Sequence, residues 1–379
     1  MRPLPDYLPY GQAHPPRAKR WLSVGALLSI ASGSGVALSS AAKPSFSLMS
    51  MGIICSLALT GISWMIRLLY YRMSLHNARY YEQLVEQDRQ EWWANHRQTF
   101  ALSEMVLLGP VGSETAHWQR LLRREHQAPK EKTEPGGQAL RLIHSFTSDP
   151  EARERQLATM LARQWLSQRR DSAPPVLSHC YWLGSESAWH AFCQQIGEDF
   201  PALPLPETAE KWQGEASLSA ITKQLSEADD ECLILIAGCQ SLIATPDLTR
   251  PAGESAVLWL ASRNGPAQLC RGEVYDAGLA ENILDVCKRA MEQSHTEQPP
   301  DPCILFTQPE TPELTQSGWN VMQYLQDANW GEPGKMEALI VITLAAMYVA
   351  QYQQPCAWIA RDPLHTLALG IIKPDKAQK

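Results

Sequence analysis

The sequence predicts an α/β fold preceded by two membrane-spanning helices, and two observations support this fold class. Close to the N-terminus lie two long apolar runs, separated by only three residues. After them, apolar stretches of strand length alternate with amphipathic stretches of helix length. Such alternation is typical of a sheet covered by helices. With 379 residues, of which 45% are hydrophobic, the chain is long enough to bury a sizeable core.

The two apolar runs cover residues 21–42 and 46–69. The first contains no charged residue, and the second contains a single arginine close to its end. Each run is long enough to cross a hydrocarbon core of about 30 Å at 1.5 Å per residue. Because the connection 43–45 is so short, the two runs must form an antiparallel hairpin. Small residues such as Gly33 and Gly35 suit close packing between its helices.

Positive charges flank this hairpin on one side. Seven arginines and lysines lie before the first run, at the end of the second or after it: Arg2, Arg17, Lys19, Arg20, Arg67, Arg72 and Arg79. The connection carries only Lys43. The positive-inside rule then makes residues 1–20 a cytoplasmic tail and places both termini in the cytoplasm. The lipid bilayer is therefore the first expected partner.

The cysteines and the net charge exclude several kinds of site in the larger, C-terminal part. All nine cysteines are dispersed and none forms a Cys-x-x-Cys pair, so we expect neither a structural zinc site nor a disulfide framework. Free thiols inside apolar runs fit a reducing, cytoplasmic compartment. The net charge of −7 gives no basic surface for nucleic acid. We also expect no cofactor.

The stretch after the second run lacks Gly and Pro from residue 74 to 101, and it predicts a juxtamembrane helix over 70–103. Trp92 and Trp93 on this helix are candidate partner contacts, because aromatic side chains are enriched at protein interfaces. Four other tryptophans are expected in the core: Trp118, Trp165, Trp182 and Trp189.

Residues 104–379 are predicted to form the α/β domain. Its first half alternates strands at 104–109, 140–146, 176–184 and 231–238 with helices at 112–125, 150–170, 187–196 and 216–228. Residues 127–138 are polar and contain Pro and Gly, so they predict an exposed loop.

Two familiar active-site motifs are absent. Gly109 and Gly112 lie between a strand and a helix but lack the Gly-Lys-Ser/Thr that a phosphate loop needs. Ser255 would need glycine at positions 253 and 257 to form a nucleophile elbow, and position 257 is valine.

The second half, residues 218–374, resembles the thiolase-like fold of the β-ketoacyl synthases. The resemblance rests on the order of several motifs: SLSAITKQLSEADDECLILIAGCQSL, RPAGESAVLWLASR, WGEPGKMEALIVITLAAMYVAQ and PCAWIARDPLHTLALGIIKP. It implies mixed sheets with helices on both faces. It also implies a homodimer, since such folds usually pair near the nucleophile helix.

The resemblance implies a catalytically inactive protein. The family uses a cysteine at the start of the nucleophile helix, where the helix dipole lowers its pKa, and two His, or His and Asn, that stabilise the oxyanion. The matching positions here hold Gly214, Gln308 and Asn329. All three catalytic positions are therefore replaced.

Residues 67–98 and 106–122 resemble accessory membrane proteins of bacterial type VI secretion machinery. The leading hypothesis is a non-catalytic scaffold or adaptor in a bacterial inner membrane, with secretion machinery as a protein partner. Two alternatives stay open. One is a membrane-tethered acyl-transfer or hydrolytic enzyme that uses Cys239 or His365, and the other is an immunity or adaptor protein for a secreted toxin.

Overall fold

The structure is a computed structural model that divides into two compact units. The N-terminal unit comprises residues 2–93, and the α/β unit comprises residues 94–379. The structure describes residues 6–39, 46–143, 147, 149–169, 175–279 and 281–375.

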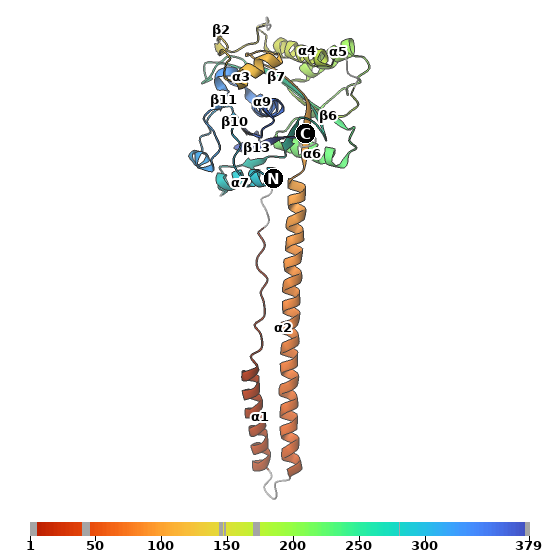
Figure 1. Cartoon of the computed structure of the whole chain (residues 1–379), viewed down its shortest axis with the longest axis vertical. Coiled ribbons are helices and arrows are strands. Elements are labelled where there is room, and N and C mark those ends of the chain that lie inside the picture. The colour runs from red at the N-terminus through yellow and green to blue at the C-terminus, as the bar shows by residue number, and fades with distance from the viewer. Residues whose placement is uncertain are drawn as a thin grey trace. The chain divides into compact units, whose positions relative to one another are not determined.

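The N-terminal unit contains α1 (Ala18–Ser39) and the first part of α2 (Phe46–His96), which lie side by side (Figure 1). Both predicted apolar runs fall largely within these helices, while the connection 43–45 lies outside the described residues. The predicted end of the juxtamembrane helix at 103 is wrong. Instead α2 is one helix of 51 residues, and residues 99–103 belong to strand β1 (Thr99–Leu108). The β-branched Thr99 and aromatic Phe100 start that strand by pairing with another strand of the sheet.

Among the described residues, two helical segments are long and apolar enough to cross a membrane. One is α2, whose most apolar window is 0% buried. The other is Gly334–Tyr352, which includes α9 (Glu337–Tyr352) and is 61% buried, as expected of a core helix. The Gly- and Ser-rich α1 is not one of the two.

Small and polar residues bring α1 against α2. A Cβ built on Gly25 would lie 3.2 Å from Thr60 Cγ2, and one on Gly33 would lie 3.5 Å from Ile53. Deeper in the hairpin, Ser56 donates a hydrogen bond of 2.9 Å to Ser32. The prediction for Gly33 is therefore confirmed. That for Gly35 is wrong, since no described atom lies within 4 Å of the place that a Cβ on Gly35 would take.

Residues 6–17, the N-terminal strap, run without helical structure along α2. Three side chains of α2 form hydrogen bonds with the strap backbone. Tyr81 donates to the Leu8 carbonyl over 3.0 Å, and Arg67 donates to the His14 carbonyl over 3.1 Å. The Ser74 hydroxyl accepts a bond of 3.0 Å from the Ala13 N–H. Tyr7 adds a hydrogen bond to Asp88. The strap is therefore fixed at four points on one helix.

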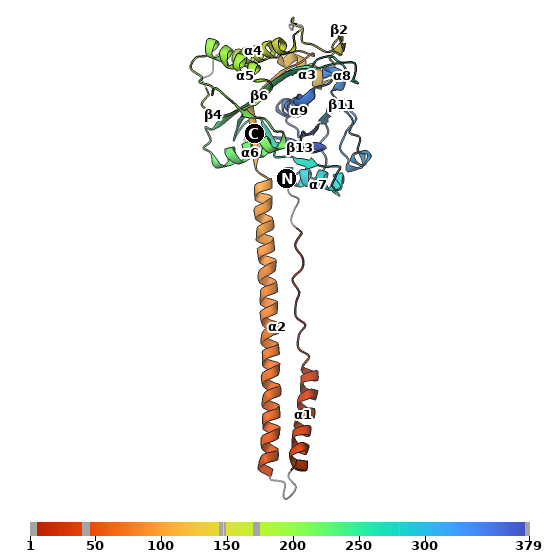
Figure 2. The same ribbon diagram turned by 180° about the vertical axis from the view of Figure 1, so that it is seen from behind.

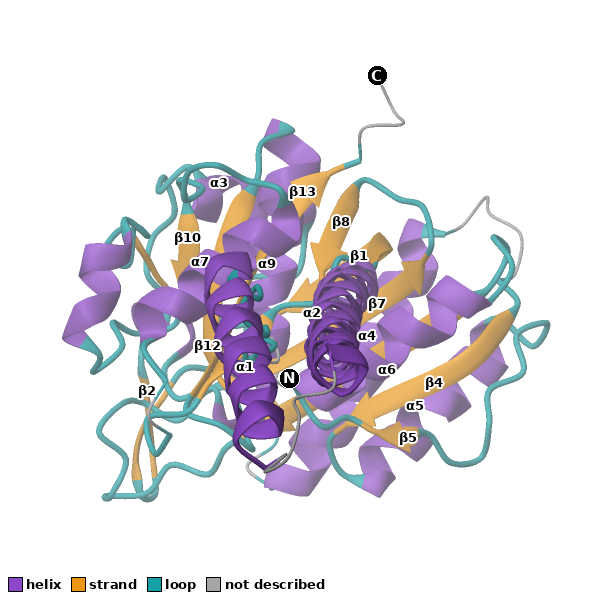
Figure 3. Cartoon of the chain, turned by 90° about the horizontal axis from the view of Figure 1, so that it is seen from below, coloured by secondary structure: helices purple, strands orange, loops and turns teal. Residues whose placement is uncertain are grey.

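The α/β unit is built on one sheet in the order β11-β10-β12-β13-β8-β1-β7-β6-β4-β5, with β9 beside β13 (Figure 3). Besides β1, its strands are β4 (Leu177–Leu183), β5 (Glu210–Lys211), β6 (Leu233–Ser241), β7 (Glu254–Ser262), β8 (Ala267–Cys270), β9 (Glu273–Tyr275), β10 (Cys303–Leu305), β11 (Tyr324–Leu325), β12 (Cys356–Arg361) and β13 (Leu367–Pro374). Parallel and antiparallel pairs both occur, so the predicted mixed sheet is confirmed.

The two arms of this sheet repeat one pattern. In the first arm β5, β4 and β6 are parallel, β7 is antiparallel to β6, and β1 is antiparallel to β7. In the second arm β11, β10 and β12 are parallel, β13 is antiparallel to β12, and β8 is antiparallel to β13. The arms meet where β1 pairs with β8. The unit is thus an internal duplication.

The helices of the unit are α3 (Thr115–Leu122), α4 (Pro150–Gln168), α5 (Glu186–Asp199), α6 (Glu215–Glu227), α7 (Ile283–Ser294), α8 (Asp327–Trp330) and α9, with 3₁₀ turns η1 (Pro312–Ser317) and η2 (Gly334–Met336). Side chains of α6 and α9 share one core with Trp259 of the first arm and Trp358 of the second. Helices α4 and α5 cover the other face of the first arm (Figure 2), and α7 covers the other face of the second. Helices therefore lie on both faces, as predicted.

Of the two predictions for residues 127–146, the exposure of the loop 127–138 is confirmed, but its lack of regular structure and the strand at 140–146 are wrong. The polar loop contains a hairpin of β2 (Lys132–Glu134) and β3 (Gly137–Ala139). Residues 140–143 are not a strand; the buried Arg141 in this segment forms ion pairs with Glu134 and with Glu254 at the start of β7. Residues 144–146 lie outside the described part of the chain.

The predictions for most tryptophans and cysteines are confirmed. The four tryptophans assigned to the core are at most 6% exposed. All nine cysteines are free, and six of them are buried: Cys180, Cys239, Cys270, Cys287, Cys303 and Cys356.

Candidate functional site

A pocket of about 560 Å³ opens where the duplicated helices α6 and α9 begin. Gln213 and Gly214 line it before α6, and Gly334 and Lys335 line it before α9. The end of β4, the β5 strand and the turn between β12 and β13 complete the wall. Equivalent helices from the two arms therefore present their N-termini to one cavity.

Gly214 starts α6 in a conformation that a side chain would strain. Its φ of +62° lies in the left-handed region that favours glycine. A Cβ built there would lie 2.6 Å from Asp362 Oδ1 and 3.1 Å from Pro363 Cδ. The Asp362 carboxylate thus takes the place that a side chain at position 214 would need.

Asp362 is held in this place by its own turn. Its Oδ2 accepts hydrogen bonds from the backbone N–H groups of Leu364, at 3.0 Å, and His365, at 3.2 Å. The His365 ring nitrogen Nδ1 lies 2.9 Å from the same oxygen. The other oxygen accepts a long bond of 3.4 Å from the Glu215 N–H in the first turn of α6. A carboxylate at this helix start is also favoured by the helix dipole.

The start of α9 is likewise occupied by a side chain of the protein. Gln240, on β6, accepts a hydrogen bond of 2.8 Å from the backbone N–H of Lys335. A Cβ on Gly334 would lie 2.5 Å from the same amide oxygen, and the φ of Gly334 is +58°. The N–H of Glu215 in α6 and that of Lys335 in η2, the turn before α9, are therefore both bonded to side-chain oxygen atoms of the protein.

The rim of the pocket carries both signs of charge. Arg361 donates to Glu337 over 2.5 Å and to Glu332 over 2.7 Å. Burial alone would lower the pKa of Arg361, but these carboxylates outweigh it and raise the pKa. Within the described part of the chain, the exposed ammonium groups of Lys211 and Lys335 have no ion-pair partner. Anions can therefore approach the rim, whereas inside the pocket the Asp362 carboxylate, at the start of α6, repels them.

Of the three positions that the resemblance in sequence matches to catalytic residues, Gly214 is the one that lines this pocket. Gln308 is exposed on the chain that follows β10. Asn329 is buried and bonded elsewhere: its Oδ1 lies 2.6 Å from His126 Nε2, and its Nδ2 donates to Gln326 over 3.1 Å. These three residues do not form one site.

The other candidate residues lie in different environments. Cys239 is 0% exposed, and burial raises the pKa of its thiol well above the usual value, so it is a poor nucleophile. Trp92 and Trp93 are partly exposed on α2, and their rings meet edge to face at 4.8 Å.

His365 was a candidate residue from the sequence, but Asp362, which its ring contacts, was not. An Asp-Pro pair directly after a strand, followed by histidine at the third position after the aspartate, is a local turn signal that could have drawn attention to Asp362. Its closeness to Gly214 had no such signal, because 147 residues separate Glu215 from Asp362.

No protein-family model and no curated protein sequence matches this chain. Among solved structures, the ishigamide ketosynthase/chain length factor superimposes with a TM-score of 0.53 at 12% identity, covering 73% of this chain and 99% of that one. The α/β unit has a thiolase-like fold. Other matches are the ChlB3 acyltransferase, at a TM-score of 0.46 and 11% identity over 73% and 98% of the two chains. The 3-oxoacyl-(acyl carrier protein) synthase III of Xanthomonas oryzae matches with a TM-score of 0.43 at 9% identity, covering 73% of this chain and 99% of that one.

This likeness places the pocket in a thiolase-like scaffold and leaves its chemistry to the residues present. A nucleophilic thiolate would need a cysteine at the start of a helix with free N–H groups around it. The start of α6 has glycine at that point, with the Asp362 carboxylate against it. The arrangement can therefore bind polar groups at its rim, but it offers no thiol nucleophile.

Proposed function

We propose that the protein is a non-catalytic scaffold or adaptor of a bacterial inner membrane. In this proposal the α1–α2 hairpin spans the bilayer and the thiolase-like unit lies in the cytoplasm. The observation that carries the proposal is the Asp362 carboxylate against Gly214, at the helix start where the resemblance would place a catalytic cysteine.

Electrostatics support the loss of acyl-transfer chemistry. A thiolate, or the oxyanion of a thioester intermediate, would be repelled by a carboxylate a few ångströms away. Asp362 cannot simply swing aside, because three donors of its own turn and α6 hold it. Restoring a cysteine at position 214 would therefore not restore activity.

The membrane placement is supported by exposure and charge. The apolar part of α2 exposes large side chains that water would not favour, such as Leu59 at 66% and Ile66 at 62%. Apolar side chains with no protein cover fit a lipid environment. The arginines and lysines beside Trp21 and Trp64 then mark the cytoplasmic side.

Partner binding is the remaining role for a scaffold. We propose Trp92 and Trp93 as contacts for a protein partner, since both rings are partly exposed. A homodimer of the α/β unit and an association with type VI secretion machinery follow from the resemblances in sequence. They belong to the same proposal.

The catalytic part of the proposal is tested with the full-length protein in detergent. We expect no release of thiol from acetyl- or malonyl-thioesters above the rate without protein. Matched variants are Cys239→Ser, His365→Ala and Asp362→Asn. Turnover by the wild-type protein that any of these variants abolishes would overturn the proposal in favour of the membrane-tethered enzyme.

The adaptor part is tested by co-purification from the native host after cross-linking, with Trp92→Ala/Trp93→Ala as the comparison. Components of a secretion machine that depend on the two tryptophans are the expected result. A single stoichiometric toxin in their place would favour the immunity protein.

A further inference from the structure

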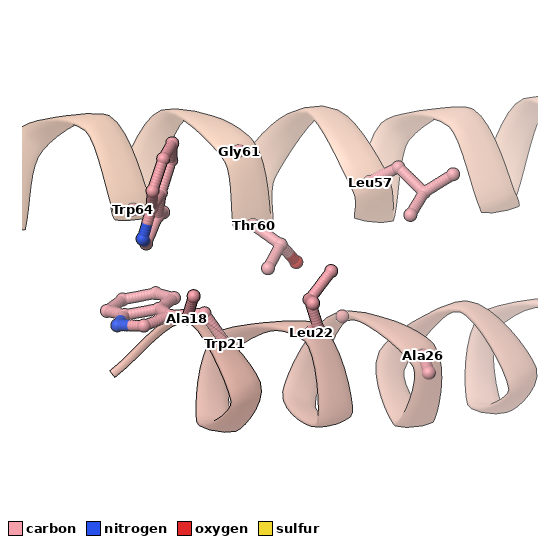
Figure 4. Close-up of a pocket in the computed structure, with 9 residues that line it drawn as sticks. Ala18, Trp21, Leu22, Ala26, Leu57, Thr60, Gly61 and Trp64 are labelled. Atoms are coloured by element: carbon pink, nitrogen blue, oxygen red, sulfur yellow. The ribbon is translucent and has the colours of Figure 1, made fainter. Parts of the chain in front are cut away.

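The N-terminal unit contains an apolar groove between α1 and α2, with a volume of about 560 Å³ (Figure 4). Its floor is where Gly25 meets Thr60, and its sides include Leu22 and Leu57. The volume lies within the ~300–1,000 Å³ typical of small-molecule sites. The groove is hollow because Gly25, Ala26 and Gly61 leave space that larger side chains would fill.

Two tryptophans mark one end of the groove. Figure 4 places Trp21 of α1 and Trp64 of α2 at the same end of the gap. Among the described residues, the buried indole N–H of Trp64 has no hydrogen-bond partner. Tryptophans of membrane proteins usually lie at the level of the lipid headgroups. This end of the groove therefore belongs at the membrane surface.

The length of the groove distinguishes a lipid chain from a partner helix. Its lining extends from Ala18 to Ala26 on α1, which is about 12 Å along the helix axis. That is close to half of a hydrocarbon core of about 30 Å. Beyond it the helices touch at Gly33 and Ile53. A transmembrane helix would need a groove through both leaflets, whereas an acyl chain needs one leaflet only.

The charge at the mouth favours an anionic headgroup. Arg17, Lys19 and Arg20 directly precede Trp21, and Arg67 lies one helical turn after Trp64. No aspartate or glutamate occurs anywhere between Asp6 and Glu82. Cations at the cytoplasmic surface attract anionic lipids, and basic pockets between membrane helices bind their headgroups.

We propose that the groove binds one anionic phospholipid of the cytoplasmic leaflet. An acyl chain fills the space between Leu22 and Leu57, and the phosphate lies at the cations beside Trp21 and Trp64. This inference rests on the membrane placement proposed above. It assigns the hairpin a specific lipid in addition to its anchoring role.

The test uses full-length protein in mild detergent, with native mass spectrometry after adding phosphatidylglycerol or phosphatidylcholine of the same acyl chains. We expect one phosphatidylglycerol to be retained in preference to phosphatidylcholine. Neutralising Arg20 and Arg67 as Arg20→Gln/Arg67→Gln should weaken phosphatidylglycerol binding by about fivefold for each charge and leave phosphatidylcholine unchanged.

A pair of glycine variants locates the site. Gly61→Leu should fill the groove and abolish retention, since no described atom lies within 4 Å of a Cβ at Gly61 to prevent the change. Gly35→Leu is the matched control, because Gly35 is equally open but lies outside the groove. Equal lipid retention by both variants and the wild type, or no preference for phosphatidylglycerol, would overturn the inference. The inference would also be overturned if the protein were a dimer that Gly61→Leu dissociates and Gly35→Leu does not.

Failure of the membrane placement is recognised separately. If the protein leaves native membranes in alkaline carbonate without detergent, the anchor itself is wrong. If it needs detergent and yet retains no phosphatidylglycerol, only the lipid site is wrong.

Discussion

Helix α2 and the segment Gly334–Tyr352, which includes α9, are both long and apolar enough to cross a bilayer, but they expose their apolar residues differently. The apolar window of α2 is 0% buried, whereas that of the α9 segment is 61% buried and packs between the two arms of the sheet. Composition therefore does not separate a membrane helix from a core helix. The surrounding protein does, because only α9 is enclosed by strands and other helices.

The largest difference should appear when each helix receives a charge. Ile340 on α9 is 0% exposed, so Ile340→Asp buries an unpaired carboxylate and should destabilise the α/β unit by at least about 4 kcal/mol. Leu59→Asp on α2, where the side chain is 66% exposed, should leave the unit folded and impair membrane insertion. Urea unfolding followed by tryptophan fluorescence measures the first effect, and membrane fractionation measures the second. Equal loss of folding in both variants would contradict the contrast.

A smaller effect is expected at the end of α2, where the chain enters the α/β unit. Burial, and then the positive charge of Arg271, lower the pKa of His96 from 6.5 to about 4. A lowered pKa in the folded state contributes stability above pH 6.5 that is lost as the pH falls towards 4. The shift corresponds to about 3 kcal/mol at most.

Unfolding of the wild type and of His96→Gln between pH 7 and pH 4 checks this value. Their difference reports His96 together with its coupling to Glu273, 3.5 Å away. Burial raises the pKa of Glu273 to about 6, so Glu273 by itself acts in the opposite direction. Parallel pH profiles for the two proteins would refute a buried neutral His96.

A threonine on each helix gives a matched pair. Thr343 on α9 accepts a hydrogen bond of 2.7 Å from the indole N–H of the buried Trp259. Thr343→Val leaves this donor unpaired and should cost about 1–3 kcal/mol. Among the described residues, Thr60 on α2 bonds only to the carbonyl of Ser56 in its own helix, at 2.8 Å, so Thr60→Val should change stability by less than about 0.5 kcal/mol. The same urea titration measures both, and a larger effect at Thr60 would reverse the comparison.

The mildest probe compares two cysteines and leaves stability unchanged. Cys356 on β12, beside α9, is 0% exposed, and burial raises its pKa well above the usual value. Cys55 on α2 is exposed. A lipid-soluble maleimide should label Cys55 at least about tenfold faster in the folded protein, because Cys356 must wait for local unfolding. Mass spectrometry of the labelled peptides reports both rates.

Much of the fold could be predicted because its signals are local. The alternation of strands and helices after residue 104 and the order of motifs from residue 218 follow from short apolar patterns. Apart from the strand expected at 140–146, the structure contains these elements in that order. The end of α2 at His96 could not be predicted from such patterns. Residues 97–103 lack Gly and Pro, and the strand conformation from Thr99 onward is decided by pairing with β7 and β8, more than 150 residues away.

The candidate site was less predictable for the same reason. The resemblance in sequence placed a catalytic cysteine at position 214, where the chain has glycine, but the carboxylate against this glycine comes from Asp362, on the other arm of the sheet. The segment around Arg141 was also mispredicted: its apolar neighbours predict a strand, whereas the buried Arg141 forms ion pairs with Glu134 and Glu254.

The N-terminal strap has one further geometrical consequence. Its anchor points on α2, at Arg67, Ser74, Tyr81 and Asp88, are spaced by seven residues each. Seven residues fall short of two full helical turns by about 20°, so a row of this spacing drifts slowly around the helix. Over the three intervals the strap therefore follows a left-handed path of about 60° around α2. Any change in the twist of α2 would rotate these anchor points and be transmitted to residues 7–14.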